Sequence, residues 1–104
     1  MYEVSDGILT ELKEKLHILH DEDDNNLKRL LSFSYNVLKE KCGNFDIENL
    51  EQGKALVFVR TRYEYNDKLE YFDENFIAEI TSLMIAIEKI ERSKKNESRN
   101  IEVF

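Results

Sequence analysis

The sequence contains no proline and no tryptophan, and only three glycines and one cysteine among 104 residues. Few residues therefore interrupt its regular segments, because proline and glycine are the residues that most often end helices. The single Cys42 has no partner for an internal disulfide, and the first residues lack a basic and then apolar secretion signal. No apolar run approaches the about 18 residues of a membrane-spanning helix. We expect one domain, used in a reducing compartment and without a membrane anchor.

The charge is unbalanced, with acids exceeding bases to give a net charge of -7. A nucleic-acid surface needs a concentrated basic face, so this charge argues against nucleic-acid binding as the main function. The sequence also has no glycine-rich phosphate loop, no recognisable Ser/His/Asp set and no separable pair of catalytic carboxylates. We therefore expect neither enzyme activity nor a cofactor.

Apolar residues recur at helical spacing in four segments, which predicts an all-α fold: a small bundle of about four helices around a long central helix. The expected helices run from Ser5 to between Leu16 and Leu19, from Glu22 to Lys41, through the stretch Asn49 to Asn75, and from about Asn75 to Glu91. The loop between the second and third helices should fold Phe45 and Ile47 back onto the core. Leu30 and Leu69 are predicted to be core residues because each lies in the middle of an apolar stripe.

The central stretch also permits a second interpretation. Residues 57–65 alternate between the two faces of a possible strand, with Val57, Val59 and Thr61 on one side. Length favours a helix, since a strand of 18 residues would be far longer than usual. If the helix runs through the whole stretch it is roughly 35–40 Å long. Its two apolar stripes predict that other elements cover it on two sides.

Three residue groups invite a site with its own chemistry, and each has a simpler interpretation. Asp21, Asp23 and Asn25 match the first positions of a calcium loop, but Asn26 and Ser32 replace its glycine and its bidentate glutamate. Capping of the second helix by Asp21 is therefore preferred. The histidines at positions 17 and 20 have no further ligand to complete a zinc site. Cys42 has no identifiable base and is expected to be a small, partly buried residue before the expected helix cap at position 43.

Arg60 and Arg62 lie close in the sequence to Tyr63 and Tyr65, and a mixture of basic and aromatic residues is also found on surfaces that bind nucleic acids. Neighbouring acids such as Glu51, Glu64 and Glu70 make ion pairs within the protein or between subunits the preferred interpretation. Both arginines are accordingly candidates for subunit contact.

The last helix and the end of the chain supply the other candidate contacts. The expected buried stripe of the last helix consists of Phe76, Ile80, Leu83, Met84, Ile87 and Ile90. Ile77 and Ile85 fall outside it, so they are expected to meet a second neighbour. Residues 1–91 are predicted to form the domain and residues 92–104 a mobile polar tail. That tail ends in an apolar tip containing Ile101, Val103 and Phe104, which is either an anchor for a partner or a frayed end.

Three motifs between Leu9 and Ile90 resemble the head-to-tail connector proteins of long-tailed bacteriophages and related prophages, especially those of Gram-positive hosts. The motifs are Leu12-Lys13-x-x-Leu16-x-Ile18, Asp21-Glu22-Asp23-Asp24-x-x-Leu27-x-x-Leu30-Leu31 and Arg60-x-Arg62-Tyr63-x-Tyr65-Asn66-Asp67-x-Leu69-x-x-Phe72-x-x-Asn75-Phe76. They are amphipathic helix signatures in the family's order and spacing. The tail lies beyond them.

The resemblance implies a helical adaptor that forms a closed ring beneath the portal vertex, extends the DNA channel and docks the next connector or stopper protein. The implied partners are the portal protein and that next protein. The implied locations are the virion and, during assembly, the host cytoplasm. Free subunits either form the ring or stay monomeric until the portal offers a template. The alternative is a small acidic helical regulator that binds a host or phage protein, while a helix-turn-helix DNA binder is disfavoured by the net charge.

Overall fold

The structure, a computed structural model, describes the backbone of residues 3–103 and the side chains of residues 3–95. These residues form α-helices joined by turns, with one short 3-10 helix and no strand. The elements are α1 (Asp6–Leu16), α2 (Asp24–Cys42), α3 (Glu51–Tyr65), η1 (Leu69–Tyr71), α4 (Phe72–Asn75) and α5 (Ile77–Val103). The predicted all-α bundle is confirmed, and the strand interpretation of residues 57–65 is excluded.

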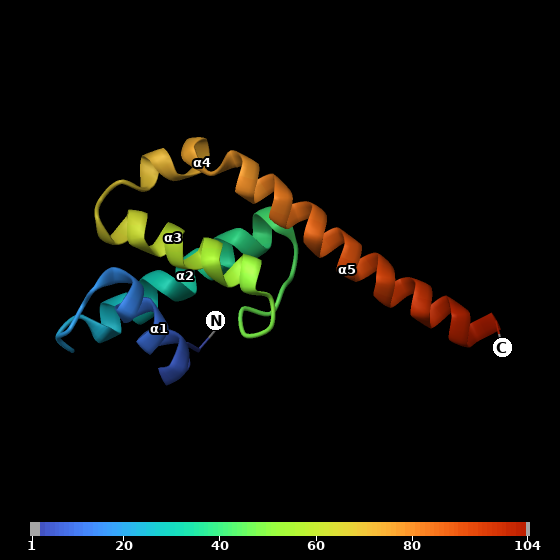
Figure 1. Cartoon of the computed structure of the whole chain (residues 1–104), viewed down its shortest axis with the longest axis horizontal. Coiled ribbons are helices and arrows are strands. Elements are labelled where there is room, and N and C mark those ends of the chain that lie inside the picture. The colour runs from blue at the N-terminus through green and yellow to red at the C-terminus, as the bar shows by residue number, and fades with distance from the viewer. Residues whose placement is uncertain (1–2, 104) are drawn as a thin grey trace.

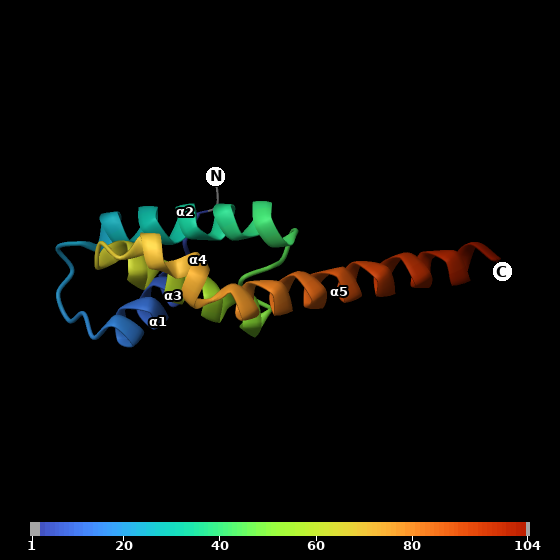
Figure 2. The ribbon, with the colours of Figure 1, turned by 90° about the horizontal axis from the view of Figure 1, so that it is seen from above.

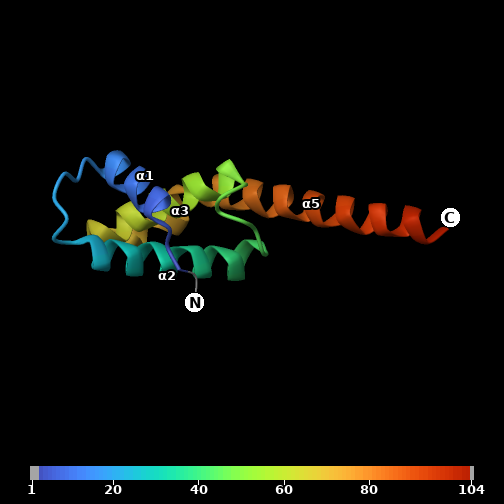
Figure 3. The same cartoon turned by 90° about the horizontal axis from the view of Figure 1, so that it is seen from below.

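The helices are arranged around α3, which packs against α1, α2, η1 and α5. Figures 1 and 2 show the C-terminal half of α5 extending beyond the other helices, which accounts for the elongated dimensions of 56 × 30 × 21 Å. Figures 2 and 3 show α3 between α1 and α2, and α2 also packs directly against α5. Within the described residues, no helix has the length and apolar character to cross a membrane.

The core consists of apolar side chains from every α-helix. Those with almost no exposed surface are Leu12, Leu27, Leu31, Leu38, Ile47, Val57, Phe72 and Leu83. As expected for a central helix, α3 is buried on more than one face, through Leu56, Val57 and Phe58. The two predicted core residues, Leu30 and Leu69, are only partly buried. Leu69 packs against the edge of the core, whereas the prediction for Leu30 is wrong because it does not belong to the core. On α2 the inward stripe passes through Leu31, and Leu30 lies about a quarter turn away from it.

The predicted long central helix is also wrong, because α3 ends at Tyr65. Asp67 has φ 58°, and its N–H and that of Lys68 donate to the carbonyls of Glu64 and Tyr63 at 3.1 and 2.8 Å. This is the hydrogen-bond pattern of a Schellman helix end. The chain then turns back through η1 and α4. The central helix is therefore about 22 Å long instead of 35–40 Å.

Other helix ends agree with the sequence in part. The Ser5 hydroxyl accepts a hydrogen bond from Ile8 N at 3.2 Å, which confirms it as the N-cap of α1. Asp23, not Asp21, is the N-cap residue of α2, and its side chain makes no capping bond. At the end of α2, Gly43 has φ 107° and ψ 165°. That conformation is open essentially only to glycine, but it is not the predicted left-handed helical one.

The last helix begins close to its expected start and continues to Val103, past its expected end at Glu91. No proline or glycine lies after Gly53, so the sequence contains no strong signal to stop it. The division into residues 1–91 and a tail of residues 92–104 stays a prediction.

Candidate protein-docking surfaces

The first candidate surface is an apolar strip on α5, which we call the α5 strip, formed by Ile77, Met84 and Ile85. These side chains are 60%, 40% and 49% exposed. The face of α5 that packs on the bundle carries Ile80, Leu83 and Ile87. At 3.6 residues per turn, Met84, Ile77 and Ile85 lie about 70°, 90° and 170° around the helix from the middle of this face. No other described element covers the strip, and so it is a surface suited to contact with another protein.

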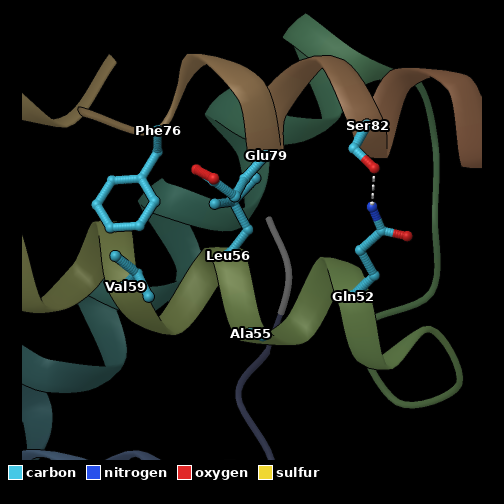
Figure 4. Close-up of a pocket in the computed structure, with 7 residues that line it drawn as sticks. All are labelled: Gln52, Ala55, Leu56, Val59, Phe76, Glu79 and Ser82. Carbon is cyan, nitrogen blue, oxygen red and sulfur yellow. Dashed lines mark hydrogen bonds between the residues drawn. The ribbon is translucent and has the colours of Figure 1, made fainter. Parts of the chain in front are cut away.

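The second candidate surface is an apolar groove between α3 and α5, which we call the α3–α5 groove. It has a volume of about 240 Å³ and is lined by Gln52, Ala55, Leu56, Val59, Phe76, Glu79 and Ser82. Figure 4 shows α3 as one wall and α5 as the other. At one end, Gln52 Nε2 donates to Ser82 Oγ at 3.0 Å. At the opposite end, the Phe76 ring projects toward Val59.

A smaller hollow of about 170 Å³ lies next to α1, on the other side of Ala55 and Val59 of α3 from the groove. It shares Ala55 and Val59 with the groove and adds Lys15, Leu16, Phe58 and Arg62. The exposed face of α3 therefore presents a narrow ridge of small apolar side chains with a hollow on each side. A ridge between hollows is a shape that another helix can pack against.

Arg60 and Arg62 lie on different faces of α3. Arg60 is only 8% exposed, and its Nη1 donates to Ser34 Oγ at 2.9 Å and pairs with Glu64 at 3.5 Å. Burial lowers the pKa of the Arg60 guanidinium, while Glu64 and Asp73 oppose that change. Arg60 therefore ties α3 to α2 inside the bundle.

Arg62, in contrast, is exposed, and its guanidinium makes no hydrogen bond or ion pair with any described residue. The two arginines do not form a shared basic patch. Of the pair, Arg62 is the one whose charge is available to another molecule.

The acidic segment before α2 binds a lysine of the same chain. Lys13 Nζ lies 2.6 Å from Asp21 Oδ1 and 2.8 Å from Asp24 Oδ1. These contacts raise the pKa of Lys13, and the hydrogen bond from Lys13 lowers the pKa of Asp21. Among the described residues, no three histidine, cysteine or carboxylate side chains are placed to hold a metal ion. His17 ends α1 in a left-handed conformation with φ 58°.

Cys42 is buried at the end of α2, where its thiol lies 3.8 Å from the carbonyl oxygen of Ile80. Burial raises the pKa of this thiol above its ordinary value. A thiol that is buried and protonated is a packing residue and a poor nucleophile.

The remaining predicted contacts fall in different parts of the chain. Ile77 and Ile85 are exposed and belong to the α5 strip. Ile101 and Val103 lie on α5, but their side chains are outside the described residues, as is all of Phe104. Sequence reasoning missed Met84 and the groove because it assigned Met84 and Phe76 to the buried stripe of the last helix. Met84 lies at the edge of that stripe, about 60° around the helix from Ile87, so periodicity alone did not separate it from the buried face.

Comparisons with known protein families, curated proteins and solved structures found no match to this chain.

Proposed function

We propose that this chain is the adaptor subunit of a head-to-tail connector in a long-tailed bacteriophage. In this role, copies form a ring beneath the portal protein, extend the DNA channel and dock the next connector or stopper protein. The proposal places the protein in the virion, and in the host cytoplasm during assembly. It follows the resemblance of the three helical motifs described above.

The observation that carries the proposal is the form of α5. It extends beyond the bundle (Figure 1) and exposes the α5 strip on a side that the bundle leaves uncovered. A subunit that must contact its neighbours and a portal needs apolar surface that its own fold does not cover. The absence of a candidate metal cluster in the described residues and the net charge of -7 are compatible with a structural role.

The test is co-assembly with the portal protein encoded by the same phage genome. Electron microscopy of portal complexes purified with the chain should show an added ring on the portal. The variant Ile85→Glu, which places a charge in the α5 strip, should reduce the added ring. Leu19→Glu is the matched control, because Leu19 is an exposed apolar residue on the loop between α1 and α2 and away from the strip.

The α3–α5 groove favours one alternative, a small acidic regulator that binds a helix of a host or phage protein. A regulator would bind one soluble protein and would be absent from purified particles. The connector proposal would be contradicted if mass spectrometry did not detect the chain in purified particles and if portal complexes showed no added ring. That result would favour the regulator.

A further inference from the structure

We infer that the α5 strip of one copy packs into the α3–α5 groove of the next copy, so that copies join head to tail. This deepens the proposed function by naming the two subunit surfaces, and it rests on that function only for the closure of the chain of copies into a ring.

The first argument is the placement of the two surfaces. Glu79 and Ser82 face the groove, whereas Ile77 and Met84 belong to the strip. Around α5, Ile77 and Met84 each lie roughly 140° to 160° from Glu79 and Ser82, while Ile85 lies about 60° from Ser82, so the middle of the strip is about 150° from the groove wall. The groove and the strip therefore lie on opposite flanks of one helix. A neighbour seated in the groove cannot also reach the strip, so a two-fold pair in which both contacts form between the same two copies is disfavoured. One contact per neighbour produces a ring or a filament.

The second argument is the match in length and chemistry. The strip extends from Ile77 to Ile85, about 12 Å along α5, and the α3 wall of the groove extends from Gln52 to Val59, about 10.5 Å. The strip is convex and apolar, and the groove is concave and lined mainly by apolar side chains. Each surface offers what the other lacks.

The third argument is charge, which also sets the direction of the incoming helix. Between Glu88 and Lys95, α5 carries four basic and two acidic residues, although the whole chain has a net charge of -7. Beyond the Gln52 end of the groove lie the exposed acids Asp46, Glu48 and Glu51, of which Glu51 also pairs with Lys54 at 3.0 Å. Within one copy, α5 already passes the loop before α3, since Asp46 and Asn49 of this loop share a hollow with residues 87–94.

An incoming α5 with its strip in the groove can therefore place its basic segment over these acids. In that arrangement it runs parallel to the α5 of the copy that receives it. Subunits that are related by rotation about an axis parallel to α5 have parallel α5 helices, as this arrangement requires.

The test uses one variant for each surface. Ile85→Glu disables the strip, and Ala55→Glu disables the groove at an exposed position on α3. Circular dichroism checks that both remain folded. In sedimentation velocity up to millimolar concentration, the unaltered protein should associate beyond a dimer, and each variant alone should be monomeric, with a Kd raised at least about tenfold.

An equimolar mixture of the two variants provides the decisive result. The intact strip of the Ala55→Glu copy meets the intact groove of the Ile85→Glu copy, so the mixture should form a dimer and nothing larger. The matched control Leu19→Glu should associate as the unaltered protein does. The inference is overturned if the unaltered protein stays monomeric, if either variant alone still associates normally, or if the mixture fails to pair.

Charge reversal tests the direction. Arg92→Glu with Lys95→Glu should weaken association most at low salt, and Glu48→Lys with Glu51→Lys in the receiving copy should restore it. An absence of rescue would overturn the parallel arrangement. The proposed function fails separately: correct pairing of the variants without any ring on the portal contradicts the connector role alone, whereas a portal ring formed by Ala55→Glu subunits contradicts this inference alone.

Discussion

Gly53 lies where α3 passes directly beneath the ring of Phe45. A methyl group at this position would stand 2.4 Å from Phe45 Cε2, which is too close for any real contact. We predict that Gly53→Ala lowers the free energy of unfolding by about 1–3 kcal/mol, because the ring must leave its place. Urea denaturation measures this change.

The matched control is Gly7→Ala in the first turn of α1, where nothing lies within 4 Å of the added methyl group. Alanine should stabilise the protein there by up to about 1 kcal/mol, because glycine is a poor helix former. Equal effects at the two glycines would show that the Phe45 contact is not the cause.

Tyr35 fixes the loop between α2 and α3. Its hydroxyl donates to the carbonyl oxygen of Phe45 and accepts from Ile47 N at 3.3 Å. Tyr35→Phe leaves both backbone groups without this partner and should cost about 1–3 kcal/mol of unfolding free energy. Tyr71→Phe is the control, because the Tyr71 side chain is 51% exposed, and it should change the unfolding free energy by less than about 0.5 kcal/mol.

At single residues, the sequence was informative wherever the deciding interaction is local. Ser5 caps the helix that it precedes, and Phe45 and Ile47 fold back onto the core as expected. Asp21 was misassigned because Lys13, eight residues away, binds its carboxylate. The Arg60 contact with Ser34 was not predicted either, since it joins residues 26 positions apart.

At the scale of elements, the largest misassignment is the end of α3. The sequence contained one signal, Asn66-Asp67, but apolar periodicity continued past it and favoured an unbroken helix. The stop depends on Asp67 adopting φ 58°, which aspartate does more readily than most residues.

Asp67→Gly should keep this turn and stabilise the protein by up to about 1 kcal/mol, because glycine adopts positive φ without strain. Asp67→Val should destabilise it by a larger amount, because a branched side chain clashes in this conformation. Thermal unfolding of both variants tests the turn, and a stabilising valine would contradict it.

The connection between α1 and α2 should make stability depend on pH at both extremes. The pKa of Asp21 is lowered in the folded protein, so its contribution to stability is present above its unfolded-state pKa of about 4. This contribution is lost as the pH falls through the lower, folded-state pKa. The pKa of Lys13 is raised, so its contribution is present below about pH 10.4 and is lost as the pH rises above that value.

Asp21→Asn should therefore destabilise the protein at neutral pH and have little effect at either extreme. Glu22→Gln is the control, because Glu22 makes no ion pair among the described residues. Urea denaturation across the pH range would contradict the assignment if the effect of Asp21→Asn were independent of pH.

At the scale of the whole molecule, the all-α class and the central helix were predictable because they follow from periodicity and from the scarcity of proline and glycine. The groove was not, since it depends on how α5 returns across α3 after the turn at Asp67. The strip was half predicted, through Ile77 and Ile85. Its third member, Met84, was assigned to the buried stripe because it lies only about 60° around α5 from Ile87, at the edge of the buried face.

Deletion of residues 92–104 should separate folding from assembly. The α5 residues that enter the core end at Ile87, and Figure 2 shows the later part of the helix extending away from the bundle. The shortened protein should keep the melting temperature of the full chain to within a few degrees, but it should not enter particles. Normal incorporation would show that the segment has no role in assembly, and loss of the fold would show that it belongs to the domain.

The net charge of -7 leads to the last prediction, which concerns DNA. Several basic side chains of the bundle are already neutralised, since Lys54 pairs with Glu11 and Glu51 at 2.9 and 3.0 Å and Lys41 pairs with Asp73 at 2.8 Å. DNA must pass through a connector without adhering, and acidic walls repel phosphate whereas basic walls hold it through counterion release. The free protein should therefore show no binding to duplex DNA in fluorescence anisotropy at about 0.15 M salt. Micromolar, salt-dependent binding that Arg62→Glu abolishes would contradict this expectation and favour a nucleic-acid interface on α3.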